Sequence, residues 1–299
     1  MKKKILALGA IAILLMSLCG CAQYEAKAAS SQETLEEDKS LAGIEEEVYK
    51  SFLESGNQSV SSIDPGLEMG YTHYLSSSGD AISLKDLQKQ MSISAKGQTV
   101  NCKFSYTIIS SSNRKVLALK ATPTDYSMES ETFLFCYYDD TLHLSDTYYE
   151  DAETTATLCK NGYLEIEKLS PDAGAKTSYC FVDAAGKVRE IYTTQEVSGE
   201  LIKEHTDEKI YKKAYRRDMP TMSVVIYDFD GKTYYDYVAE GEELSEKDQD
   251  FIIRTSQAGY TWLTSDEMKT IQDKKLKELK LMQDFFDTNE TAFFPIISD

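Results

Sequence analysis

The chain has few of the residues and motifs that metal-binding and catalytic proteins use. It contains three histidines, His73, His143 and His205, and no CxxC pair. It also lacks the GxSxG nucleophile elbow, the HExxH zinc motif, the glycine-rich phosphate loop and the dinucleotide fingerprint. Residues 112–115 match the SxxK pattern of penicillin-recognising enzymes, but the companion KTG and SDN motifs are absent. We therefore predict no catalytic residue, no metal site and no cofactor, and the sequence favours a protein that is not an enzyme.

Basic residues are also scarce. The 32 lysines and arginines are outnumbered by 50 aspartates and glutamates, which gives a formal net charge of −18. Proteins that bind nucleic acid depend on clustered Lys and Arg side chains that displace counterions from phosphates. The charge therefore excludes nucleic acid as a main partner and predicts a well-solvated surface.

A long apolar run is missing as well. The N-terminal run spans residues 5–18, which is shorter than the roughly 20 residues that cross a bilayer as a helix. It follows three lysines and is closed by Leu18-Cys19-Gly20-Cys21, the arrangement of a secretory signal peptide. This segment resembles a bacterial lipobox. The resemblance implies cleavage between Gly20 and Cys21 and attachment of fatty acyl chains, such as palmitate, at Cys21.

The composition divides the chain into three parts. Residues 1–20 form the predicted lipoprotein signal peptide, and residues 21–40 form a disordered acidic tether rich in Ala, Ser, Gln and Glu. Residues 41–299 form one extracytoplasmic domain, with a helical or irregular lead-in (41–97), a β-rich core (98–240) and a helical tail (241–299). Loss of the signal peptide removes three lysines, which moves the net charge to −21. The predicted location is the outer face of the cell membrane, through the lipid anchor.

The central part has the pattern of antiparallel strands. Short runs rich in β-branched and aromatic residues alternate with turn residues. Asn161-Gly162 and Asp230-Gly231 suit tight hairpin turns with positive φ. We predict an α+β fold built on an antiparallel meander of about ten strands, at residues 103–110, 116–122, 132–138, 142–149, 154–159, 163–169, 178–183, 188–194, 222–229 and 233–238.

Helices are predicted on both sides of this core. Apolar residues at three- and four-residue steps predict a helix over residues 41–52, and a brief helical pattern occupies residues 84–91. Ser245 with Asp248, and Thr264 with Glu267, each precede an apolar periodic stretch as capping residues do. The sequence therefore predicts two C-terminal helices that pack on the sheet.

The cysteines leave two alternatives open. Besides Cys19 and Cys21, the chain has four cysteines on predicted strands outside the cytoplasm, and four cysteines permit three disulfide pairings. Buried free thiols are equally compatible with these positions. The four candidates are Cys102, Cys136, Cys159 and Cys180.

Tyrosine is unusually abundant, with 20 residues and clusters at positions 137–138, 148–149 and 234–237. A tyrosine offers a flat apolar face and a polar tip, which suits contacts to sugars, peptides and proteins. Half-exposed strands also favour tyrosine without any ligand. Because neighbours on a strand point to opposite faces, at most half of each cluster shares one surface. We select Tyr138, Tyr148 and Tyr235 as candidate ligand contacts.

The lipobox, the acidic tether, residues 48–53 and the Tyr-rich hairpins that turn at Asp-Gly-Lys resemble uncharacterised lipoproteins of anaerobic, gut-dwelling Firmicutes. This resemblance implies a lipoprotein but no established activity. The leading hypothesis is a non-catalytic binding module for a surface glycan, a peptide or an envelope protein. One alternative is an envelope hydrolase that acts on glycan or peptide, with carboxylates gathered by the fold. The other is the solute-binding lipoprotein of a transporter, although such proteins are built largely from parallel sheets.

Overall fold

The computed structural model describes residues 43–54, 60–63, 83–91, 102–124, 130–170, 174–198, 222–238 and 244–296. By internal contacts the chain divides into two units, Met1–Glu47 and Val48–Asp299, and both sheets belong to the second unit. The predicted signal peptide and tether lie outside the described residues, so they stay predictions. Within the described ranges, no helix has both the length and the apolar character that crossing a bilayer requires.

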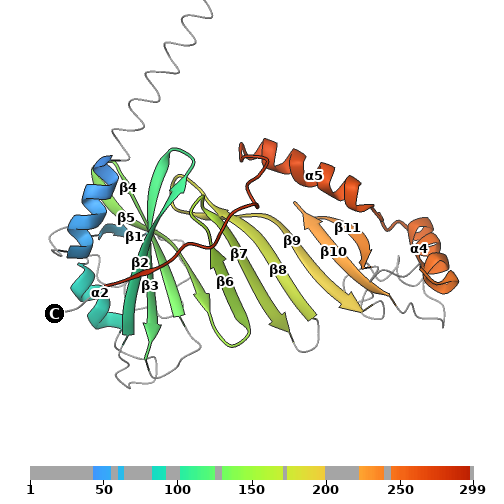
Figure 1. Ribbon diagram of the computed structural model, residues 1–299, viewed down its shortest axis with the longest axis horizontal. Coiled ribbons are helices and arrows are strands. Elements are labelled where there is room, and N and C mark those ends of the chain that lie inside the picture. The colour runs from blue at the N-terminus through green and yellow to red at the C-terminus, as the bar shows by residue number, and fades with distance from the viewer. Residues whose placement is uncertain are drawn as a thin grey trace, which may run out of the picture. The chain divides into compact units, whose positions relative to one another are not determined.

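The structure has an α+β fold with twelve strands in two six-stranded sheets (Figure 1). The first sheet has the order β1-β5-β4-β3-β2-β12, and the second has the order β11-β10-β9-β8-β7-β6. The strands of the first sheet are β1 (Val60–Ile63), β2 (Cys102–Ser111), β3 (Arg114–Pro123), β4 (Ser130–Tyr138), β5 (Thr141–Glu150) and β12 (Phe294–Pro295). Those of the second are β6 (Thr154–Leu158), β7 (Tyr163–Ser170), β8 (Gly174–Val182), β9 (Val188–Ser198), β10 (Ser223–Phe229) and β11 (Lys232–Val238).

The predicted hairpin-connected strands are confirmed. Each of the ten predicted runs overlaps one of the strands β2 to β11, and consecutive strands pair antiparallel within each sheet. Asp230 and Gly231 have φ values of 53° and 76°, as a primed turn requires. The sequence pattern did not indicate the division into two sheets, the parallel pairing of β1 with β5 or the two-residue strand β12.

The predicted helices are also present. A helix covers residues 43–54, and three more follow: α2 (Leu84–Met91), α4 (Glu246–Ala258) and α5 (Ser265–Glu278). The Ser245 hydroxyl accepts a hydrogen bond from the Asp248 backbone at the start of α4. Thr264 and Glu267 form a reciprocal capping box at the start of α5. Both N-terminal boundaries therefore lie where the capping residues predicted them.

The first sheet is covered on both faces. One face packs against α2 and residues 48–53 through a core that includes Tyr49, Phe52, Phe133 and Phe135. The other face packs against the β6–β8 part of the second sheet through residues such as Leu134. A sheet with two apolar faces buries side chains in near-continuous runs, which is why the pattern of β4 does not alternate.

The second sheet is covered less completely. One face meets the first sheet over β6–β8, and it meets α4 over β9–β11, through a core that includes Val224, Ile226 and Phe251. The opposite face packs against α5 and the segment after it, through Tyr163, Tyr192 and other residues near one end of the strands. In Figure 1, α5 lies along that end of the strands, while α4 lies beside β10 and β11.

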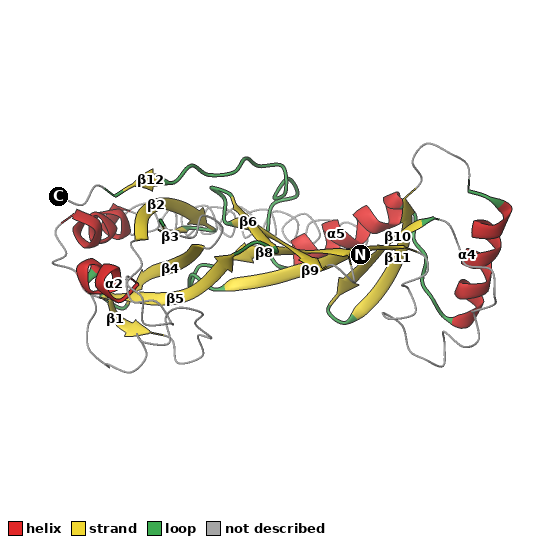
Figure 2. Ribbon diagram, turned by 90° about the horizontal axis from the view of Figure 1, so that it is seen from below, coloured by secondary structure: helices red, strands yellow, loops and turns green. Residues whose placement is uncertain are grey.

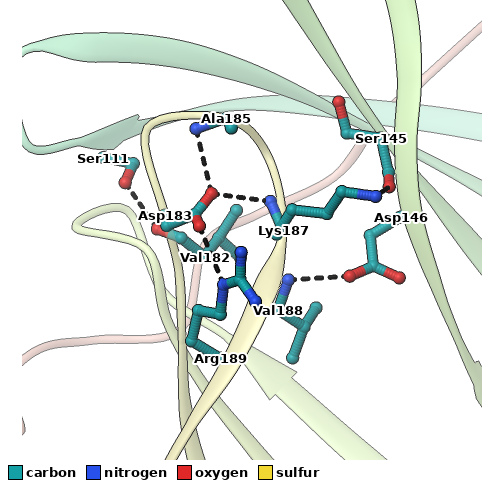
Figure 3. A network of polar contacts seen from close by, with 9 residues as sticks. All are labelled: Ser111, Ser145, Asp146, Val182, Asp183, Ala185, Lys187, Val188 and Arg189. Carbon is teal, nitrogen blue, oxygen red and sulfur yellow. Dashed lines mark hydrogen bonds and ion pairs between the residues drawn. The ribbon is translucent and has the colours of Figure 1, made fainter. Parts of the chain in front are cut away.

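The turn between β8 and β9 joins the two sheets (Figure 3). The Ser111 hydroxyl donates to the Val182 carbonyl, and the Lys187 ammonium donates to the Ser145 carbonyl at 2.6 Å. The Val188 backbone donates to Asp146 at 2.8 Å. Within the turn, Asp183 accepts hydrogen bonds from the backbone of residues 185 and 187. These bonds fix the second sheet to the first at a defined position.

The C-terminal segment joins the sheets a second time. Figure 2 shows it running from the end of α5 past β6 to β2. Thr291 donates a backbone hydrogen bond to Leu158 on β6, and its hydroxyl contacts that of Thr107 on β2 at 3.0 Å. Strand β12 then pairs with β2, and Ile296 donates to the Phe104 carbonyl. The edges of β6 and β2 are thus occupied by residues of the same chain, which limits edge-to-edge aggregation.

Candidate functional site

The predicted tyrosine contacts occupy different environments. Tyr138 is 38% exposed at the end of β4, where its ring stacks on His143 with centroids 3.7 Å apart. Tyr148 is 7% exposed within the core between the sheets, and Tyr235 is 4% exposed beneath α4. Because their rings are enclosed by core side chains, Tyr148 and Tyr235 present no surface to a ligand. Their burial therefore does not favour these two residues as ligand contacts.

The remaining predicted site residues separate into two groups. Gly20 and Cys21 lie outside the described residues. The four strand cysteines are free thiols in the structure, and Cys136, Cys159 and Cys180 are buried. Burial raises the pKa of Cys180 to about 12, and the nearby Glu190 charge adds to this effect. Burial likewise raises the thiol pKa of Cys102 and Cys159. These thiols are protonated at neutral pH, so the structure supports the free-thiol alternative and not a nucleophilic role.

The structure instead brings together a row of tyrosines from three adjacent strands of the second sheet. Tyr179 on β8 stacks on Tyr192 on β9, with ring centroids 4.4 Å apart and planes 11° apart. Tyr192 in turn lies 6.4 Å from Tyr227 on β10. The rings of Tyr179 and Tyr227 are half-buried, whereas Tyr192 is enclosed between them. Tyr192 belongs to the core cluster that α5 and the segment after it cover, and Tyr179 and Tyr227 pack against this cluster while staying half-buried.

Carboxylates flank this row on both sides. Glu165 is paired with Tyr179 in the register of β7 and β8, and Glu167 lies two residues further along the same face of β7. Asp236 lies on β11, and its charge acts on Tyr227. Each of these three side chains is half-buried. We call this surface the tyrosine face and define it as Glu165, Glu167, Tyr179, Tyr192, Thr194, Tyr227 and Asp236.

Several hydrogen bonds hold the side chains of the tyrosine face in place. Gln272 of α5 donates to the Tyr192 hydroxyl at 3.0 Å. The Tyr163 hydroxyl donates to Glu165 at 2.6 Å, and the Tyr163 ring packs edge-on against Phe286. Because α5 and the segment after it fix these neighbours, the face is preorganised before any ligand arrives.

The tyrosine hydroxyls stay neutral over the whole physiological range. Burial raises the pKa of Tyr179, and the charges of Glu165 and Glu167 raise it further. Burial also raises the pKa of Tyr192 and Tyr227, and for Tyr227 the Asp236 charge adds to the effect. Neutral hydroxyls donate and accept hydrogen bonds but are poor nucleophiles and bases. These hydroxyls therefore serve for hydrogen bonding and aromatic contact.

Burial also acts on Asp236. It raises the pKa of this carboxyl above its usual value, although a hydrogen bond from the Tyr237 backbone opposes the shift. A half-buried carboxylate whose charged form is disfavoured gains when a cation or hydrogen-bond donor approaches it. A cationic ligand or a hydrogen-bond donor would therefore offset part of the cost of burying the Asp236 charge.

The sequence does not predict the row of tyrosines, because a β-bulge sets the pairing of Tyr179 with Tyr192. The register of β8 and β9 shifts between Tyr179 and Cys180, so that Cys180 pairs with Glu190 but Tyr179 pairs with Tyr192. Without the bulge, Tyr179 would lie opposite Ile191, and Tyr192 would point to the other face. The pairing of Tyr227 with Tyr234, in contrast, follows directly from the two-residue turn at Asp230-Gly231.

Comparisons with known proteins found no match to a family model, a curated protein or a solved structure. In the part of the chain that the structure describes, no three His, Cys, Asp or Glu side chains are grouped so that they could hold a metal ion.

Proposed function

We propose that this protein is a lipid-anchored extracytoplasmic binding protein that holds its ligand on the tyrosine face and performs no chemistry on it. The observation that carries the proposal is that the half-buried rings of Tyr179 and Tyr227 are held on either side of Tyr192, which is itself 4% exposed and supports them from within the core. Tyrosine gives large, rigid contact area at a low cost in conformational entropy, and it is enriched at interfaces. Stacking between the rings reduces that cost further.

The partial burial of the tyrosine face supports this proposal. A half-buried aromatic side chain still has surface to bury when a ligand arrives, whereas a core residue has none. Polar tips beside aromatic rings also allow a ligand to be oriented by hydrogen bonds. The tyrosine face has both features. The rings of Tyr179 and Tyr227 are half-buried, and the hydroxyl of Thr194 lies beside them.

Anchoring at Cys21 is the second part of the proposal. It is supported by the lipobox-like residues 18–21 and by the short apolar run before them. A residue such as Cys21 would carry enough acyl chain to hold the protein on a membrane, since each buried methylene contributes about 0.8 kcal/mol. Metabolic labelling with palmitate is expected to mark the wild-type protein but not Cys21→Ala. Equal labelling of both would contradict the anchor.

The binding role is tested with the full-length protein, purified in detergent, on an array of cell-wall fragments, glycans and peptides. For any ligand that binds saturably, Tyr227→Ala is expected to lower the affinity about tenfold, which corresponds to about 1.4 kcal/mol. Tyr237→Ala is the matched control, because Tyr237 lies on the same sheet with its side chain on the opposite face and is 39% exposed. Tyr227→Phe, which keeps the packing and removes only the hydroxyl, is expected to lower the affinity by a smaller factor.

Equal affinities of wild type and Tyr227→Ala for every bound ligand would contradict the proposed site. Each variant is first checked for cooperative unfolding, so that a loss of binding is not confused with a loss of fold. The absence of saturable binding to any member of the array would contradict the binding role itself.

One observation favours a second candidate function, a hydrolase acting on glycan or peptide. Glu165 and Glu167 lie two residues apart on one face of β7, a spacing of roughly 7 Å along a strand. Glycosidases use two carboxylates at about 5 to 10 Å. Mass spectrometry of the incubated ligands decides between the two functions. Released products that disappear with Glu165→Gln would establish the hydrolase and overturn the non-catalytic proposal.

A further inference from the structure

The charge of the tyrosine face is unbalanced. Glu165, Glu167 and Asp236 are half-buried, and in the part of the chain that the structure describes none of them forms an ion pair. Glu165 accepts a hydrogen bond from a neutral donor, the Tyr163 hydroxyl. Half-buried carboxylates are screened less by solvent than fully exposed ones, so their negative potential extends over the tyrosine rings.

The described cations beside this face do not remove the imbalance. Lys275 of α5 bonds to Asp230 at 2.5 Å and is thereby paired. Lys232 lies opposite Phe229 at the turn end of the β10–β11 hairpin and is exposed. It is separated from Asp236 by four residues along β11, roughly 13 Å. The carboxylates therefore keep a net negative field at the end of the face that α5 does not cover.

The arrangement of the carboxylates sets the length of a complementary ligand. Glu165 and Glu167 are on β7 and Asp236 is on β11, which is four strands away in the order of the sheet. At about 4.8 Å between neighbouring strands, the two ends of the face are roughly 19 Å apart. An extended peptide of about six residues covers this distance.

The groups between the two ends favour a peptide over a simple diamine. The hydroxyls of Tyr179, Tyr227 and Thr194 lie between the carboxylates and suit the amide groups of a peptide backbone, whereas a polyamine offers only methylene groups and further charges there. Aromatic rings also attract cations through their π faces. Glu196 on β9 lies on the same face as Asp236 and is exposed, so one more carboxylate lies between the two ends. The hydroxyls beside it match the amide groups of a peptide backbone, and the carboxylates match its positive side chains.

We propose that the ligand of the tyrosine face is an extended basic peptide segment that crosses the strands from β7 to β11, with Lys or Arg side chains at both ends. This inference rests on the binding site proposed above and names the chemistry of its ligand. The positive ends contact Glu167 and Glu165 on one side and Asp236 on the other, and the backbone between them contacts Tyr179, Thr194 and Tyr227.

The test uses the full-length protein in detergent and a blocked hexapeptide, acetyl-Lys-Ala-Ser-Ser-Ala-Lys-amide, with calorimetric detection. Matched peptides carry Gln or Glu in place of both lysines, and spermidine serves as the non-peptide cation. We expect saturable binding of the lysine peptide, at least fivefold weaker binding of the glutamine peptide and no binding of the glutamate peptide. Raising the salt concentration from 50 to 300 mM is expected to lower the affinity for the lysine peptide.

Isosteric variants locate the contacts. Glu167→Gln and Asp236→Asn are each expected to lower the affinity two- to threefold, and the double variant about tenfold. Glu167 is preferred to Glu165 because the Tyr163 hydroxyl bonds to Glu165. Glu190→Gln is the control, because Glu190 is exposed on the same sheet and pairs with Cys180 on the opposite face. It is expected to leave the affinity unchanged.

The failure of this inference is distinguishable from failure of the binding site. A neutral ligand whose binding depends on Tyr227 but not on Glu167 or Asp236 would keep the site and overturn the basic peptide. Spermidine binding as tightly as the lysine peptide would overturn the peptide part. No binding of the lysine peptide at millimolar concentration, or equal loss in Glu190→Gln and Glu167→Gln, would also overturn the inference.

Discussion

Strands β4 and β8 show how the two sheets differ. In β4, seven consecutive residues, Ser130–Cys136, are buried, because both faces of the first sheet are covered. In β8, only Cys180 and Val182 are buried, and the residues toward Gly174 are half-buried or exposed. A strand with two covered faces has only a structural role. A strand with one partly open face can also contact a ligand.

The comparison assigns the two sheets different roles. The first sheet and the residues packed on it supply most of the largest fully buried side chains, such as Phe133 and Phe135, with 1% exposure or less. The second sheet is held to it through the Val182–Val188 turn. Its residues Glu165, Glu167 and Asp236 form no ion pair within the described part of the chain. The first sheet is therefore the scaffold, and the second sheet carries the site.

The largest effect is expected from a cavity in the scaffold. Phe135→Ala removes a ring that is 1% exposed and packs 5.3 Å from Phe52, so it is expected to lower the free energy of unfolding by about 3 to 5 kcal/mol. Tyr149→Ala on the same sheet, with a ring that is 51% exposed, is expected to change it by less than about 0.5 kcal/mol. Urea denaturation measures both. Similar losses in the two variants would remove the distinction between covered and open positions.

Two glycines with similar φ angles test whether the β8–β9 turn is packed against the first sheet. Gly186 has φ +74°, and an added Cβ would lie 3.0 Å from the Ser145 Cβ and 3.2 Å from the Cys136 Cβ. Gly231 has φ +76°, but nothing lies within 4 Å of its added Cβ. Gly231→Ala is expected to cost about 1 kcal/mol for the backbone alone, and Gly186→Ala at least about 2 kcal/mol because the first sheet must also shift.

Thermal unfolding of the two glycine variants gives the comparison directly. If Gly186→Ala were no less stable than Gly231→Ala, the β8–β9 turn would not be packed against the first sheet. The two sheets would then not be joined at this turn.

At the tyrosine face, a substitution of Asp236 is expected to change stability by less and in the opposite direction, toward higher stability. The folded-state pKa of Asp236 is raised above its usual value of 3.8, so the folded protein holds this proton more tightly than the unfolded chain. The favourable contribution is complete below pH 3.8 and is lost as the pH rises through the folded pKa. Asp236→Asn is therefore expected to raise the unfolding midpoint slightly at pH 7 and to leave it unchanged at pH 3. A lower midpoint at pH 7 would show that the Asp236 charge stabilises the fold.

The smallest effect is expected from reducing agent. The four strand cysteines are free thiols in the structure, so neither sheet is covalently cross-linked. The urea midpoint is expected to be the same with and without reductant. A midpoint that falls on reduction would show that a disulfide contributes, since removing one typically costs about 2 to 5 kcal/mol.

The strands and helix starts were predictable because their signals are local. Ser245 and Thr264 begin their helices as predicted, and the Asp230-Gly231 turn fixes the pairing of β10 with β11. The alternation rule correctly separated Tyr234 from Tyr235 into opposite faces. Local patterns therefore determined the elements and, in part, their register.

The choice of face was not predictable from these signals. Within the 148–149 and 234–235 pairs, the sequence gives no reason to prefer one member, and Tyr148 and Tyr235 proved to be the buried ones. Which face is covered depends on the placement of α4, α5 and the other sheet, which are long-range contacts. The row of Tyr179 and Tyr192 also depends on a bulge that no residue pattern signals.

The most direct test of the tyrosine face is an NMR titration of ¹³C-tyrosine-labelled protein with the lysine hexapeptide, with resonances assigned through single Tyr→Phe variants. We expect the resonances of Tyr179 and Tyr227 to shift along a saturable curve, while those of Tyr149 and Tyr237, which are exposed elsewhere, stay in place. Shifts confined to Tyr149 or Tyr237, or no shift at all, would contradict the claim that the tyrosine face binds the ligand.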